Sequence, residues 1–156
     1  MAVTLTVNGT SRSFDALADA DRSLLDVLRN ELDLRASHFG CGVGQCGACM
    51  VLLDGHAVPS CDTPLWSADG KDVRTAEGLG TRAAPHALQL AFIEEQAAQC
   101  GYCTSGMLIS AAALLRRDAD PDEAAIRAGM ARNLCRCGTH PRVMRAIVRV
   151  AARSRP

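Results

Sequence analysis

Residues 40–49 read GCGVGQCGAC, a stretch that places three thiols among four glycines. This much glycine is incompatible with a regular helix or strand, so the stretch is predicted to be a loop. A backbone without Cβ atoms can approach a bound group closely and can adopt positive φ angles. The loop is therefore suited to wrapping around a small group that thiols bind.

A β-hairpin is predicted directly after this loop. Its first strand is 50–53, its turn is Asp54-Gly55 and its return strand passes through Ala57 and Val58. Cys61 lies just beyond the return strand, so the hairpin brings a fourth thiol back toward the loop. The first set of thiols is spaced C-x4-C-x2-C-x11-C and consists of Cys41, Cys46, Cys49 and Cys61.

The spacing of this first set is that of an iron-sulfur loop. It contains the C-x4-C-x2-C…C run of plant-type [2Fe-2S] ferredoxins. Zinc is the weaker alternative, because structural zinc sites usually use paired short spacings. Disulfides are also disfavoured, since the chain opens MAVTLTVNGT without an export signal and the cytosol keeps ordinary thiols reduced.

A second set of thiols has a different spacing, C-x2-C-x31-C-x-C. It consists of Cys100, Cys103, Cys135 and Cys137. Two sets of four thiols predict two metal sites. Spacing alone leaves both zinc and iron-sulfur open for this second site.

The N-terminal half is predicted to be a small β-rich unit. Val3, Leu5 and Val7 alternate before an Asn8-Gly9 turn, and a second strand follows through Ser13 and Phe14. A helix should then pack on the sheet through a single apolar stripe. That stripe consists of Leu24, Leu25, Leu28 and Leu32.

The C-terminal half is rich in alanine, leucine and arginine and is predicted to be helical. Asp120 is the expected N-cap of the third helix, with Pro121 at its first position and Glu123 at the capping-box position. The cysteine pairs fall between the first and second helices and between the third and fourth, so a four-helix bundle could bring all four thiols together. The four helices are expected at about 85–95, 105–115, 121–133 and from 141 onward.

Three segments in this order resemble the iron-sulfur subunit of the xanthine oxidase family of molybdenum hydroxylases. They are residues 40–49, residues 99–107 (QCGYCTSGM) and residues 133–138 (NLCRCG), and the resemblance covers nearly the whole chain. It implies an α+β protein with an N-terminal β-grasp plant-type ferredoxin domain at 1–77. An all-α four-helix-bundle domain at 82–156 would follow, and each domain would bind one [2Fe-2S] cluster through its own thiols.

The resemblance also implies a partner and a role. A large subunit would bind the molybdopterin-type molybdenum cofactor, and Gln99 and Cys137 match family positions that touch the pterin. The chain would be the electron-transfer subunit of an oxidoreductase complex. It would pass electrons from the molybdenum centre through the helical-domain cluster and then the ferredoxin-like cluster to a cytochrome c or a flavin subunit. The substrate would be an aldehyde or an N-heteroaromatic ring.

The residues of the last motif indicate which branch of the family the chain resembles. Residues 135–140 read CRCGTH and are similar to the small subunits of isoquinoline, nicotinate and membrane-linked aldehyde oxidoreductases. Ser37-His38, Met50 and Ser105 depart from residues common among relatives, but none of these departures removes a thiol. In this branch electrons often leave through a cytochrome c.

No catalytic residue is predicted on this chain. Its four histidines lie in unrelated sequence contexts and no catalytic constellation is evident. Nucleic-acid binding is disfavoured because aromatic residues are few and the C-terminal arginines recur at helical spacing opposite an apolar face. No window is apolar enough for a membrane span, so a cytoplasmic location is expected, or a periplasmic or membrane-associated one through a partner.

Two other functions are consistent with eight thiols. One is a stand-alone two-cluster ferredoxin that carries electrons between diffusing partners. The other is a zinc-stapled interaction module without a redox role. Visible charge-transfer absorption and [2Fe-2S] EPR signals would separate the redox functions from the zinc module.

Overall fold

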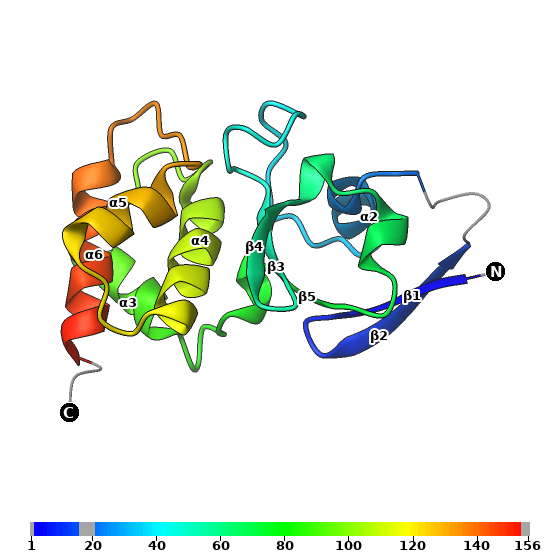
Figure 1. The fold of residues 1–156 in the computed structure, drawn as a ribbon, viewed down its shortest axis with the longest axis horizontal. Helices are drawn as coiled ribbons and strands as arrows, with labels where there is room; N and C mark the ends of the chain where they lie inside the picture. Colours follow the sequence, from blue (N-terminus) through cyan, green and yellow to red (C-terminus); the bar gives the residue numbers. More distant parts are fainter. Residues whose placement is uncertain (1, 16–20, 154–156) are drawn as a thin grey trace.

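The computed structural model describes residues 2–15 and 21–153. In this part of the chain, a five-stranded sheet and five α-helices form two halves that lie side by side along the long axis of the molecule (Figure 1). The sheet belongs to the N-terminal half and four of the helices belong to the C-terminal half. The α+β class expected from the sequence is therefore confirmed.

The sheet is built from two hairpins joined by a short central strand. The strand order is β2-β1-β5-β3-β4, and each hairpin is antiparallel. The predicted hairpins are both present, whereas β5 was not predicted; it pairs parallel with β1 and antiparallel with β3. The strands are β1 (Ala2–Val7), β2 (Thr10–Asp15), β3 (Met50–Leu53), β4 (His56–Pro59) and β5 (Asp72–Arg74).

Helix α2 (Leu24–Asn30) covers one face of this sheet. Ser23 caps its N-terminus by accepting a hydrogen bond from the N–H of Asp26. The buried side of the helix, with Leu24, Val27 and Leu28, packs against the alternating apolar residues of β1. Three 3-10 turns connect the remaining elements, at Ser60–Asp62, Leu65–Ala68 and Ala76–Gly78.

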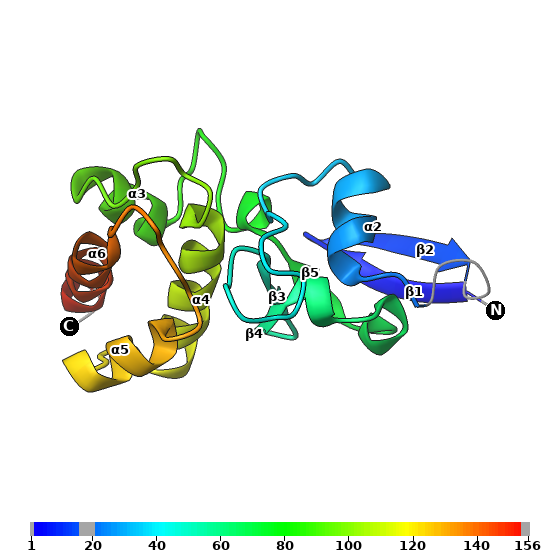
Figure 2. The same cartoon turned by 90° about the horizontal axis from the view of Figure 1, so that it is seen from above.

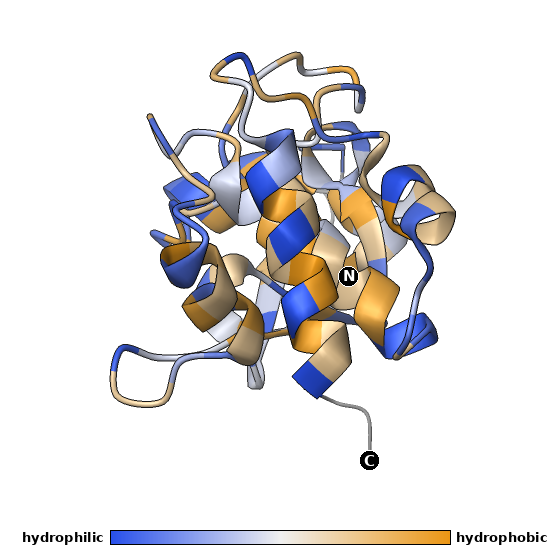
Figure 3. Cartoon of the chain, turned by 90° about the vertical axis from the view of Figure 1, so that its left-hand side faces the viewer, coloured by the Kyte–Doolittle hydropathy of each residue, from blue (hydrophilic) through white to orange (hydrophobic). Residues whose placement is uncertain are grey.

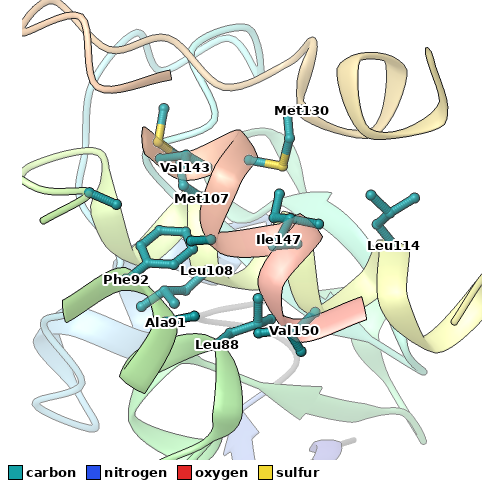
Figure 4. Packing of buried hydrophobic residues seen from close by; sticks show 14 of the residues in the cluster. Leu88, Ala91, Phe92, Met107, Leu108, Leu114, Met130, Val143, Ile147 and Val150 are labelled. Carbon is teal, nitrogen blue, oxygen red and sulfur yellow. The ribbon is translucent and has the colours of Figure 1, made fainter. Parts of the chain in front are cut away.

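The C-terminal half contains α3 (Ala87–Glu94), α4 (Thr104–Arg117), α5 (Glu123–Met130) and α6 (His140–Arg153). Their apolar side chains meet in one core, where Leu88 and Phe92 of α3 face Met107 of α4 and Ile147 of α6 (Figure 4). Helix α6 is amphipathic, with hydrophilic and hydrophobic residues alternating along its ribbon (Figure 3). No helix in the described residues is both long and apolar enough to cross a membrane.

Arginines on the outer side of α6 form ion pairs with two glutamates at the C-terminal end of α3, Glu94 and the C-cap residue Glu95. Arg145 and Arg149 each donate to the carboxylate of Glu95 at 2.9 Å, and Arg153 lies 3.0 Å from Glu94. The arginines that the sequence placed opposite the apolar stripe thus link two helices of the same chain.

Two helix starts differ from the predicted ones. Helix α3 begins after Pro85, because the side chain of His86 accepts from the N–H of Leu88 and acts as the N-cap. Helix α5 is capped by Asp122, which accepts from the N–H of Ala125, so the prediction of Asp120 as the cap was wrong. Pro121 therefore lies outside this helix, which also ends at Met130 rather than near residue 133.

The two halves are joined by an apolar contact as well as by the chain. Helix α4 lies against β3 and β4 (Figure 2). Ile109 of α4, fully buried, packs with Met50 and Leu52 of β3 and with Ala76. This contact fixes the position of the sheet relative to the helices and therefore of the two cysteine sets.

Candidate metal centres

The first cysteine set is assembled by the hairpin that follows the 40–49 loop. Cys49 immediately precedes β3 and is buried, whereas Cys61 lies in the 3-10 turn after β4. Pairing of Met50 with Pro59 brings these two cysteines to the same end of the hairpin. Ser60 holds them there, because its hydroxyl donates to the carbonyl of Cys49 at 2.6 Å. The predicted return of the fourth thiol toward the loop is thus confirmed.

Backbone N–H groups of the loop point at the sulfur of Cys41. Gln45, Cys46 and Val43 donate to Cys41 Sγ at 3.2, 3.4 and 3.5 Å. These hydrogen bonds lower the pKa of the exposed Cys41 thiol to about 6. The loop therefore stabilises negative charge on this sulfur, as ligation by a thiolate requires.

Cys61 is less exposed than Cys41. Its pKa is raised to about 12 because burial disfavours the thiolate, although the N–H of Gly44 donates to its sulfur at 3.4 Å. Gly44 has a φ of +68°, and a Cβ at this position would lie 3.1 Å from Pro59 and Asp62. The close approach of the loop to Cys61 therefore depends on glycine.

The second cysteine set lies where two interhelical segments meet. Cys100 and Cys103 lie in the turn between α3 and α4, and Cys135 and Cys137 lie in the segment between α5 and α6. Burial and the neighbouring Cys135 thiol together raise the pKa of Cys103 to about 12. The helical half thus brings together the thiols of Cys103 and Cys135.

Cys135 has a different electrostatic environment. Burial raises its pKa, but hydrogen bonds from the hydroxyl and N–H of Thr139, together with those from Cys103 and the N–H of Cys137, lower the pKa to about 7. The hydroxyl of Thr139 donates to Cys135 Sγ at 3.1 Å. Thr139 was not singled out from the sequence, because nothing in its local pattern shows that its side chain turns toward a cysteine.

Gln99 and Cys137 lie next to each other at the edge of the second set. The side-chain amide of Gln99 donates to the carbonyl of Cys137 at 3.4 Å. Gln99 is exposed and Cys137 is partly exposed, so both can be reached from outside the chain.

The first loop has two features that a [2Fe-2S] cluster needs. A binuclear cluster places two ligands on each iron, and its sulfides need nearby N–H donors and close backbone approach. Both features are present in the first loop, where a Cβ on Gly40 would come within 2.6 Å of Cys46 Sγ.

The two cysteine sets are linked by direct contacts between their loops. The N–H of Leu134 donates to the carbonyl of Cys46 at 2.9 Å, and Cys135 is the next residue. Arg132 and Asn133 donate to the carbonyls of Gly44 and Gly47 at 2.8 and 3.3 Å. The backbone of Cys46 is therefore hydrogen-bonded directly to the residue that precedes Cys135.

The 99–107 segment also contacts the first loop. The hydroxyl of Tyr102 donates to the carbonyl of Phe39, and the Tyr102 ring stacks on His38 with 4.5 Å between the ring centres. Gly106 lies directly against Gly47, where a Cβ would come within 1.9 Å of the Gly47 carbonyl oxygen. These contacts link residues far apart in the sequence, so no spacing pattern predicted them.

Two domain families match the chain. The 2Fe-2S iron-sulfur cluster binding domain matches residues 5–82, and the [2Fe-2S] binding domain matches residues 75–148. The chain is thus a protein with two [2Fe-2S]-binding domains.

Whole-chain relatives identify the family. The chain is 50% identical to a nicotinate dehydrogenase subunit of Pseudomonas putida over 96% of this chain and 94% of that one. It is also 50% identical to an isoquinoline 1-oxidoreductase subunit of Brevundimonas diminuta, over 84% of this chain and 86% of that one. The chain belongs to the iron-sulfur subunits of the xanthine oxidase family of molybdenum hydroxylases, which are parts of oxidoreductase complexes.

Solved structures have the same fold. The aldehyde oxidoreductase of Desulfovibrio desulfuricans superposes with a TM-score of 0.91 at 40% identity over 97% of this chain. This chain corresponds to 17% of the length of that protein. Quinoline 2-oxidoreductase of Pseudomonas putida 86 superposes with a TM-score of 0.86 at 35% identity, over 99% of this chain and 97% of that one.

Proposed function

We propose that this chain relays electrons, one at a time, to an external acceptor from a large partner that contains molybdenum. Bound [2Fe-2S] clusters supply the one-electron chemistry. The thiolates of Cys41, Cys46, Cys49 and Cys61 hold the ferredoxin-like cluster in a β-grasp domain at 1–77. Those of Cys100, Cys103, Cys135 and Cys137 hold the other in a four-helix domain at 82–156. The overlap of the two family matches at 75–82 supports a boundary in this region.

The hydrogen bond from Leu134 to Cys46 carries this proposal. It joins the two cysteine-bearing loops at 2.9 Å. Because Leu134 is covalently bonded to Cys135, this one hydrogen bond is the only non-covalent step on the path from Cys135 to Cys46 through Leu134. The apolar contact of α4 with β3 holds the loops in this position. The two proposed clusters can therefore stay at a fixed distance from each other.

The direction of the relay follows from the partner. Gln99 and Cys137 are accessible at the edge of the second set, and we assign them the contact with the partner's molybdopterin cofactor.

Exposed apolar residues border both cysteine sets. Leu134 and Tyr102 lie at the second set, and Phe39 and Val43 lie at the first. Such residues suit the docking of partner proteins, which we propose are the large subunit and an electron acceptor. We propose that this acceptor is a cytochrome c or a flavin subunit.

The substrate class comes from the relatives. Their names refer to nicotinate, isoquinoline, quinoline and aldehydes. We therefore propose that the complex oxidises an N-heteroaromatic compound or an aldehyde, with substrate bound entirely by the large subunit.

Ligand substitution with EPR tests the two-cluster assignment. The intact complex is purified from its host, and Cys49→Ser is compared with Cys103→Ser, the matched change in the other set. Each variant should lose or alter one [2Fe-2S] signal and retain the other, and Cys137→Ser should affect the same signal as Cys103→Ser. If Cys49→Ser and Cys103→Ser affected the same signal, the assignment of two separate sites would be wrong.

Co-purification tests the relay itself. A large molybdenum subunit should purify with this chain, and the substrate of that complex should reduce both clusters. A chain recovered from its host without such a partner would instead be a free ferredoxin, and a colourless chain with bound zinc would be a structural module.

A further inference from the structure

Thr139 is a buried residue whose hydroxyl is directed at a cysteine of the second set. Its side chain and backbone together are only 2% exposed, and Oγ1 lies 3.1 Å from Cys135 Sγ. In the first set, by contrast, backbone N–H groups donate to the sulfurs of Cys41, Cys46 and Cys61. A side-chain hydroxyl donor to sulfur is thus a feature of the second set.

The hydroxyl is placed where it would ordinarily cap a helix. Thr139 immediately precedes α6, and its carbonyl accepts from the N–H groups of Arg142 and Val143. An N-cap threonine usually accepts a hydrogen bond from the first turn through its side-chain oxygen. In the part of the chain described, Thr139 Oγ1 has no such bond with the first turn of α6 and donates to sulfur instead.

The surrounding backbone keeps the hydroxyl in this position. Gly138 donates its N–H to the carbonyl of Cys135 at 3.3 Å, which closes a tight turn from Cys135 to Gly138 directly before Thr139. The ring of His140 is bonded to the carbonyl of Asn133 at 2.7 Å, so the residue after Thr139 is also anchored. The contact between oxygen and sulfur therefore does not depend on a freely rotating surface side chain.

The contact places a hydrogen-bond donor directly on a sulfur of the second set, in a position closed to solvent. A donor that stabilises charge on a thiolate also stabilises the additional electron that a cluster accepts, because that charge spreads onto the sulfurs. The proton remains on the threonine oxygen throughout.

We propose that the Thr139 hydroxyl raises the reduction potential of the [2Fe-2S] cluster bound through Cys135, and so favours electron transfer from the partner onto this chain. The proposal rests on the assignment of Cys135 as a ligand of the second cluster. Thr139 is then a tuning residue that acts through a ligand sulfur and does not itself bind iron.

An EPR-monitored redox titration of the intact complex tests this role. Thr139→Val keeps the shape of the side chain but removes the hydroxyl, whereas Thr139→Ser retains it as the matched control. In the valine variant the ratio of reduced to oxidised second cluster at a fixed potential should fall about tenfold, equivalent to a midpoint about 59 mV lower for a one-electron couple. The serine variant should stay close to the wild type, and the first cluster should keep its potential in both.

Three results would overturn the proposal. One is an unchanged midpoint of the second cluster in Thr139→Val, and another is an equal shift of both clusters, which would indicate a general structural change. If valine prevents assembly of the second cluster, Thr139→Ala is titrated in its place and must show the same selective shift. The third is a Cys135→Ser variant in which both EPR signals are unaltered. That result would show that Cys135 is not a ligand of the second cluster, and it would therefore distinguish a wrong ligand assignment from a wrong tuning role for Thr139.

Discussion

At the scale of single residues, each cysteine set contains one thiol that favours its charged form and one that resists it. In the first set these are Cys41, with a pKa of about 6, and Cys61, with a pKa of about 12. Backbone N–H groups produce the first shift and burial produces the second. Cluster assembly must therefore remove a proton from a thiol that holds it strongly, and metal binding supplies the necessary free energy.

This difference predicts the order of alkylation in the cluster-free chain. Iodoacetamide reacts with thiolates, so exposed Cys41 should react first at pH 7, and its rate should rise through pH 6 and level off above about pH 8. Cys61 should react far more slowly, and its rate should still be rising above about pH 9, because its thiol is protonated below about 12. Time-resolved peptide mass spectrometry measures both rates. Equal labelling of Cys41 and Cys61 at pH 7 would contradict the opposed pKa shifts.

A glycine at the junction of the two sites gives a second prediction at this scale. Gly106→Ala should destabilise the protein by about 1–3 kcal/mol, because the new methyl group would collide with the backbone of Gly47 and not with a movable side chain. Gly129→Ala is the matched control in another helix, where the methyl group would meet only the side chain of Leu114 at 3.1 Å. Denaturant unfolding of the two variants should separate them, and equal stabilities would show that the Gly47 contact can relax.

At the scale of elements, sequence patterns predicted the two hairpins correctly, because a hairpin is determined by interactions between residues close in sequence. Both hairpins follow from alternating apolar residues around Asn-Gly and Asp-Gly turns, and Asn8 and Asp54 adopt the positive φ that such turns need. Strand β5 could not be predicted in this way. It has three residues, of which only Val73 is buried, and it exists because β1 and β3 lie on either side of it.

In the candidate site too, the two cysteine sets were predictable from the sequence, whereas the contacts between the two sets were not. The spacing of the cysteines predicted two sets, and the structure brings Cys41 to Cys46 and Cys103 to Cys135, the latter pair across 31 intervening residues. The contacts of Leu134 with Cys46 and of Gly106 with Gly47 depend instead on how α4 packs against β3. No local pattern contains that packing.

The cap of α5 gives a prediction at the scale of elements. Asp122→Ala should cost about 1 kcal/mol of unfolding free energy, because it removes the 2.7 Å hydrogen bond to the N–H of Ala125 at the start of the helix. Asp120→Ala, at the residue that the capping pattern had favoured, should cost less. Chemical denaturation compares the two, and a larger loss for Asp120→Ala would place the helix start two residues earlier.

At the scale of the whole molecule, the packing of the two halves fixes the distance between the two cysteine sets, over which electrons would pass in the proposed relay. The sheet and the helices share the apolar contact around Ile109, and both cysteine-bearing loops lie at the same junction. A movement of one half relative to the other would break the hydrogen bond between Leu134 and Cys46. The fold is therefore expected to act as a rigid spacer between its two redox centres.

Substitution of Leu134 tests whether this junction conducts electrons. Leu134→Pro removes the N–H that donates to the Cys46 carbonyl, whereas Leu134→Ala keeps that donor and trims only an exposed side chain. After a flash-generated reductant delivers electrons to the intact complex, rapid-freeze EPR can follow how quickly they distribute between the two clusters. The proline variant should equilibrate more slowly than the wild type, and the alanine variant should match the wild type. Equal rates in all three, with both clusters intact, would mean that electrons cross between the halves by another route.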